Sequence, residues 1–96
     1  MNKYEIMFIV RPDIDEDTRK KTVTSLEKIL ASDKATITLS KELGQIEFAY
    51  EIKDFKSGYY YLYNIEAPNS KATKEFDRVA KINENIVRHL VLKIED

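Results

Sequence analysis

The chain has 96 residues, neither cysteine nor tryptophan, and a formal net charge of −1 from 16 basic and 17 acidic side chains. This length suffices for one core, so we expect a single domain over residues 1–96. The lack of cysteine excludes disulfides and thiolate metal sites, and the small net charge means that any nucleic-acid contact must come from a local patch. No long apolar segment and no basic leader are present, so we expect a cytoplasmic protein without membrane contact.

The N-terminal part predicts a strand and a helix. Residues 3–10 are rich in β-branched and aromatic side chains, which is typical of a central strand, and Pro12 follows its end. Asp13 or Asp15 can cap a helix over residues 16–31, whose apolar positions recur at intervals of three and four.

Two neighbouring strands are predicted next. Residues 35–52 form one long bent strand or two short ones, because Gly44 lies among them and a glycine inside a strand favours a bulge. Residues 54–58 predict a turn, so the segment that follows should pair antiparallel with the strand before it.

That following segment is the most aromatic part of the chain, since residues 58–63 hold four of the six tyrosines. Strand alternation separates Tyr60 from Tyr59 and Tyr61. Farther along, the apolar residues change parity, so we predict a bulge near Tyr63-Asn64 that leaves Tyr60 in the core and Tyr59 and Tyr61 on the outer face. Exposed tyrosine rings suit base stacking or a protein interface.

The C-terminal part predicts a second helix that is capped by Ser70 or Asn69 and runs to about residue 82, and a last strand over residues 86–93. The order is then β-α-β-β-α-β, in the α+β class. Right-handed crossovers turn this order into a four-stranded antiparallel sheet with both helices on one face, the ferredoxin-like arrangement, and the other face stays open.

The residues for an enzyme are missing. His89 is the only histidine, the acidic run 13–17 lacks the glycine and distant glutamate of a calcium loop, and two glycines cannot form a phosphate-binding loop. We therefore expect no catalysis, no cofactor, no metal and no small-molecule substrate. Residues 56–62 partly match the RNA-recognition signature of a basic residue, glycine and aromatics.

Four blocks occur in a fixed order over nearly the whole chain: Lys3-Tyr4-Glu5-Ile6-Met7 leading into Arg11-Pro12, Gly44 followed by Phe48-Ala49-Tyr50-Glu51-Ile52, residues 54–60, and residues 75–83 before Ile86-Val87-Arg88-His89. Together they resemble the family of the sixth protein of the bacterial small ribosomal subunit. The resemblance implies the ferredoxin-like fold and no enzyme activity. It also implies binding to small-subunit ribosomal RNA together with the eighteenth small-subunit protein, during assembly of the central platform.

One position departs from that family, which usually carries two basic residues where this chain has Ile46 and Glu47. Replacing two cations by an apolar residue and an acid weakens the attraction for phosphate at this spot. Either the basic pair is not essential for RNA contact, or this chain relies more on its protein partner and on other cations.

Two sets of site residues follow as expectations. Phosphate contacts are expected from the cations Lys3, Lys41, Arg88 and Lys93. Contact with the protein partner is expected from Met7, Ile9, Ile46, Tyr59, Tyr61 and His89. The alternative is a small ligand-binding or regulatory domain of the same fold that forms homodimers through its open sheet face.

Overall fold

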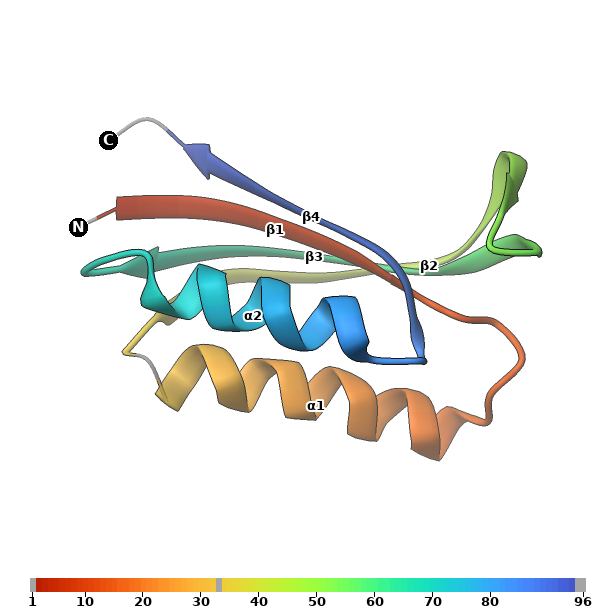
Figure 1. The fold of residues 1–96 in the computed structure, drawn as a ribbon, viewed down its shortest axis with the longest axis horizontal. Helices are drawn as coiled ribbons and strands as arrows, with labels where there is room; N and C mark the ends of the chain where they lie inside the picture. Colours follow the sequence, from red (N-terminus) through yellow and green to blue (C-terminus); the bar gives the residue numbers. More distant parts are fainter. Residues whose placement is uncertain (1, 33, 95–96) are drawn as a thin grey trace.

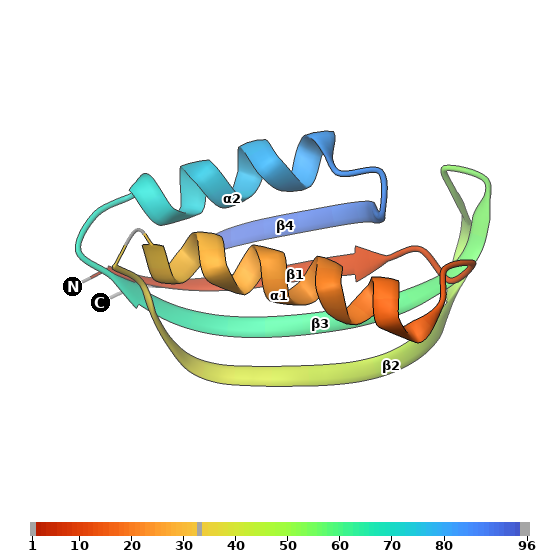
Figure 2. The ribbon, with the colours of Figure 1, turned by 90° about the horizontal axis from the view of Figure 1, so that it is seen from below.

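The structure, a computed structural model, describes residues 2–32 and 34–94 as four strands and two helices. They follow one another as β1 (Asn2–Val10), α1 (Glu16–Ser32), β2 (Thr36–Ile52), β3 (Phe55–Ala67), α2 (Lys71–Ile82) and β4 (Ile86–Ile94). The strands form one antiparallel sheet in the order β2-β3-β1-β4, and both helices lie on the same side of it (Figures 1 and 2). This confirms the predicted ferredoxin-like fold. No helix in the described ranges is long and apolar enough to cross a membrane.

The helix α1 begins where its sequence favours a cap. The backbone N–H of Arg19 donates to the carbonyl of Asp15, and the Asp15 carboxylate accepts hydrogen bonds from the hydroxyl and the backbone N–H of Thr18. These bonds hold the pKa of Asp15 below its usual range. Acidic Glu16 and Asp17 in the first turn also suit the positive end of the helix dipole. Of the two cap candidates, the structure therefore selects Asp15.

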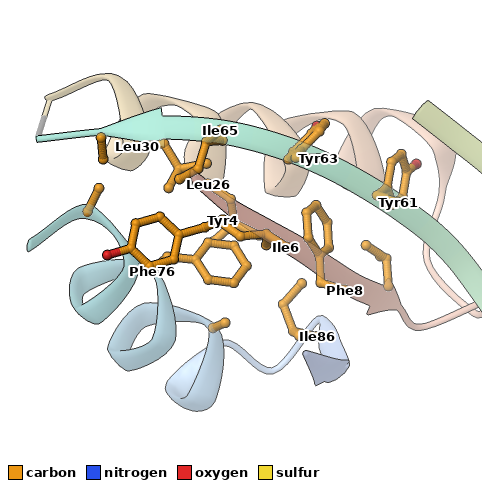
Figure 3. Close-up of a cluster of buried hydrophobic side chains, with 14 residues drawn as sticks. Tyr4, Ile6, Phe8, Leu26, Leu30, Tyr61, Tyr63, Ile65, Phe76 and Ile86 are labelled. Atoms are coloured by element: carbon orange, nitrogen blue, oxygen red, sulfur yellow. The ribbon is translucent and has the colours of Figure 1, made fainter. Parts of the chain in front are cut away.

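The core lies between the sheet and the helices, and Phe8 of β1 is at its centre (Figure 3). The ring centroid of Phe8 is 5.2 Å from that of Tyr61, 5.7 Å from that of Tyr63 and 5.9 Å from that of Phe76. Leu26 of α1 is fully buried beside these rings. Aromatic contacts from two strands and a helix thus fix the sheet against the helices.

The strand β2 is bent at several points. Its pairing with β3 shifts between Glu42 and Gly44, where Gly44 has a φ of +84°, and the predicted bulge at this glycine is confirmed. A larger irregularity lies between Glu47 and Ile52, four residues of β2 facing one of β3, and the hairpin there projects beyond the helices (Figures 1 and 2). The turn itself lies at residues 53–54, earlier than predicted.

The predicted faces of the tyrosine strand are wrong. The pairing of β1 with β3 runs without interruption, so no bulge occurs in β3 near Tyr63-Asn64. Tyr61 and Tyr63 are 6% and 1% exposed on the helix side, and Tyr59 packs against the same core, whereas Tyr60 lies on the opposite face. The irregularity that the parity change suggested lies on the neighbouring strand β2.

Candidate interface on the open sheet face

The sheet has one side that neither helix covers, and we call this side the open face. Residues directly opposite each other in neighbouring strands share a face, so the register identifies its members. Met7 of β1 lies opposite Leu62 of β3 and Leu90 of β4, and Ile9 lies opposite Tyr60 and Arg88. The members that the register assigns are Lys3, Glu5, Met7, Ile9, Lys41, Ile46, Tyr60, Leu62, Asn64, Glu66, Arg88, Leu90 and Leu92.

One half of the open face, next to the projecting hairpin, is apolar. It contains a shallow hollow of about 200 Å³ lined among others by Met7, Ile9, Tyr60, Arg88 and Leu90. The side chain of Leu90 is 46% exposed. Large apolar side chains around a hollow with one cation at its border are typical of a protein-interface core.

Gly58 allows side chains of the neighbouring strands to pack closely over β3 in this half of the face. A Cβ at Gly58 would clash with Cγ2 of Ile9, and it would lie 3.2 Å from Cζ of Phe48, a tight contact that requires the ring to shift slightly. Phe48 folds back from the hairpin toward Tyr60, with ring centroids 6.1 Å apart. The missing side chain thus lets Ile9 and Phe48 pack over β3, and Ile9 is only 4% exposed.

The other half of the open face mixes charged and apolar side chains, since Leu92, which is 49% exposed, lies opposite Glu5. Lys3 forms an exposed salt bridge with Glu66, with 3.9 Å between Nζ and Oε1. Glu5 lies opposite Asn64, whose buried Oδ1 accepts no hydrogen bond from any described residue. This half therefore carries opposite charges and an amide, and it has no net basic character.

The four cations predicted to contact RNA are not brought together. Lys3 and Arg88 lie toward opposite ends of the open face, since Lys3 pairs with Glu66 and Arg88 lies opposite Ile9. Lys41 is on the edge strand β2, opposite Leu62. Lys93 lies opposite Tyr4, a core residue, and so it faces the helix side. These cations border the sheet at separate points and form no single basic patch.

Three residues that were predicted to contact the partner from the open face have their side chains on the helix side of the sheet. His89 lies opposite Phe8, and its Nε2 is 2.7 Å from Oδ1 of Asp77 in α2. The guanidinium of Arg19 lies 3.9 Å from the ring centroid of Tyr59, and its Nε donates to the hydroxyl of Tyr61 at 3.1 Å. Burial and nearby Glu42 raise the pKa of Tyr61. The side chains of Tyr59, Tyr61 and His89 thus contact the helices, on the side opposite the apolar half, although His89 also contributes to the lining of the hollow.

Met7, Ile9 and Ile46 do lie on the open face, and the residues missed there are Tyr60, Leu62 and Leu90. The sequence contains a signal for these residues, because they are the large apolar side chains at alternate positions of β3 and β4, on the side that faces away from the helices. Within residues 2–32 and 34–94, no group of three or more His, Cys, Asp or Glu side chains could hold a metal ion.

Comparison with known proteins gives two findings. The family model described as ribosomal protein S6 matches residues 3–93. The crystal structure of 30S ribosomal protein S6 from Thermotoga maritima is similar to this chain with a TM-score of 0.91 and 28% sequence identity, covering 97% of this chain and 87% of that one. The match extends over the sheet, both helices and the open face, and the chain therefore belongs to the ribosomal protein S6 family, the sixth-protein family of the small ribosomal subunit.

Proposed function

We propose that this protein is a structural, non-catalytic component of the small ribosomal subunit in the cytoplasm, and that it binds small-subunit ribosomal RNA jointly with the eighteenth small-subunit protein. Family membership supports the ribosomal role. The observation that carries the joint binding is the apolar half of the open face, where Leu90 is 46% exposed beside a hollow. An isolated RNA-binding surface would place cations there instead.

The distribution of charge also supports joint binding of the RNA by this protein and its partner. The net charge of −1 suits the acidic member of a pair whose other member is basic. Since Lys3, Lys41 and Arg88 lie at separate borders of the open face, each can meet a phosphate only where RNA passes the edge of the protein pair. The partner would then cover the apolar half, and the bordering cations would fix the position on the RNA.

The experiment changes the apolar half without touching the core. Leu90→Glu introduces an acid next to the hollow, and Ile82→Glu is the matched control, since Ile82 is a 69% exposed apolar residue at the end of α2 and away from the open face. We expect Leu90→Glu to weaken binding of the partner by roughly tenfold or more and Ile82→Glu to leave it unchanged. Titration calorimetry with the purified partner measures both.

The RNA part is measured by sedimentation with small ribosomal subunits and by co-binding to small-subunit ribosomal RNA at low salt. If the wild-type protein together with its partner does not bind the RNA, the ribosomal proposal is wrong. A second outcome distinguishes the regulatory alternative. If the wild-type chain self-associates, the Leu90→Glu variant does not, and both bind the partner equally, the open face joins two copies of this protein.

A further inference from the structure

The helix α2 lies on the side of the sheet away from the open face (Figure 2), and its outward side carries a row of cations. Lys71, Lys74, Arg78 and Lys81 are spaced by three, four and three residues, which places them on one side of a helix. All four are exposed, and the buried residues of α2 lie on its other side. We call these four residues the α2 stripe. It extends along about 15 Å of the helix axis.

The stripe is poorly neutralised within the described part of the chain. Only Arg78 forms a salt bridge there, with Glu75, whose pKa this contact lowers. The first turn of α2 contains Lys71 and no acid, although the positive end of the helix dipole disfavours a cation. Neighbouring like charges at intervals of three and four also repel each other. α1 differs, because its first turn carries Glu16 and Asp17.

We propose that the α2 stripe is a second RNA-contacting surface, which binds the phosphate backbone of ribosomal RNA on the side of the protein away from its protein partner. This inference rests on the proposed function and adds to that function a specific surface that contacts the RNA. The four cations of the stripe outnumber the two acids of α2, Glu75 and Asp77, so a polyanion can supply the remaining negative charge. A straight row of long, flexible cations fits a phosphate backbone without reading bases.

The stripe also agrees with the position of Lys93. This predicted RNA residue lies opposite Tyr4 and so faces the side of the sheet on which α2 packs. The helix side therefore holds five cations in α2 and β4 that could meet phosphate, whereas the open face holds its cations at separate borders. One protein can then contact its partner on one side and RNA on the other.

The test removes the lysines of the stripe and keeps the Arg78–Glu75 salt bridge. The variant carries Lys71→Gln, Lys74→Gln and Lys81→Gln. The control carries Lys20→Gln, Lys21→Gln and Lys28→Gln, an equal change of net charge at exposed positions of α1, and it removes the exposed Lys20–Glu16 salt bridge as well. Binding to full-length small-subunit ribosomal RNA is measured in the presence of the partner protein, as a function of salt concentration. Thermal unfolding checks that both variants fold.

We expect the stripe variant to lower the slope of log affinity against log salt by about two units, because each phosphate contact contributes about 0.7–0.9 unit. At 0.1 M salt this corresponds to a loss of affinity of up to about a hundredfold, and the α1 control should lose far less. The stripe inference alone is overturned if the wild-type protein binds the RNA and both variants have the same slope.

Two further outcomes also decide. If the stripe variant loses affinity for the partner protein in the absence of RNA, the stripe contacts protein and the inference is wrong. If the wild-type protein and its partner do not bind the RNA at all, the proposed function fails and the stripe inference fails with it.

Discussion

Two tyrosines of β3 show how differently one residue type is used on the two faces of the sheet. Tyr63 is 1% exposed, and its hydroxyl donates to Oε2 of Glu27 at 2.7 Å. Burial raises the pKa of Tyr63, and the hydrogen bond to Glu27 raises it further. Tyr60 lies on the open face next to the hollow, and its ring faces Phe48. The first phenol stabilises the fold, and the second is available to a partner.

A pair of substitutions tests this division. Tyr63→Phe should lower the free energy of unfolding by about 1.5 kcal/mol, because the hydrogen bond is to a charged group and its loss leaves the carboxylate of Glu27 without this donor. Tyr60→Phe should change it by less than about 0.5 kcal/mol, as expected for a substitution that removes no buried contact. Urea unfolding of the two variants measures the difference, and equal effects would show that the faces are assigned wrongly.

Among the elements, α1 is held at its start by a cap that depends on a charge. The pKa of Asp15 is lowered by hydrogen bonds from Thr18. A carboxyl group with a lowered pKa in the folded state stabilises the fold at pH values above its pKa in the unfolded chain. This contribution is lost as the pH falls through the pKa of the folded state, because the protonated group no longer accepts both bonds. The pH dependence of Asp15 therefore lies in the acid range.

We expect Asp15→Ala to lower the Tm by several degrees at pH 7 and by less near pH 2, because falling pH shifts the wild-type carboxyl toward its protonated form. Asp15→Asn is the control, because asparagine keeps a capping oxygen and has no charge to titrate. Calorimetric scans at both pH values measure the shifts. A difference between wild type and Asp15→Ala that stays constant across the acid range would contradict the role given to the charge.

The order of the elements and the bounds of most of them could be predicted because each helix has its own apolar spacing and each strand its own composition. The helix predicted over residues 16–31 is observed as Glu16–Ser32, and the strand predicted over residues 86–93 as Ile86–Ile94. The bulge at Gly44 followed from the conformational freedom of glycine. These features depend on local physics, which the sequence contains.

The faces of β3 could not be predicted in the same way, because both faces carry large apolar side chains. Alternation shows that Tyr60 and Tyr61 point to opposite sides, but it does not show which side is the core. That choice is made by the pairing with β1, where Phe8 lies opposite Tyr61, and pairing is a long-range property. The same long-range register places the imidazole of His89 beside Asp77 of α2.

At the scale of the whole molecule, Ile46 and Glu47, the two positions expected from the sequence to depart from the family, lie on different sides of the sheet. Ile46 is opposite Gly58 and belongs to the open face, and Glu47 is opposite Ser57 and points to the other side. Side chains at these two positions therefore start from opposite faces of the edge strand β2. The two substitutions are therefore separate tests of where RNA lies relative to β2.

We expect Ile46→Arg to tighten binding to small-subunit ribosomal RNA in the presence of the partner and to steepen its salt slope by about one unit, because it adds one cation to the open face. Glu47→Arg should change the slope less if the RNA passes on the side of the open face, and the two changes together should not exceed about two units. Filter binding over a series of salt concentrations measures each variant. If neither substitution changes the slope, β2 does not face phosphate. If Ile46→Arg instead weakens binding of the partner without RNA, Ile46 belongs to the protein contact, and the apolar half of the open face extends across β2.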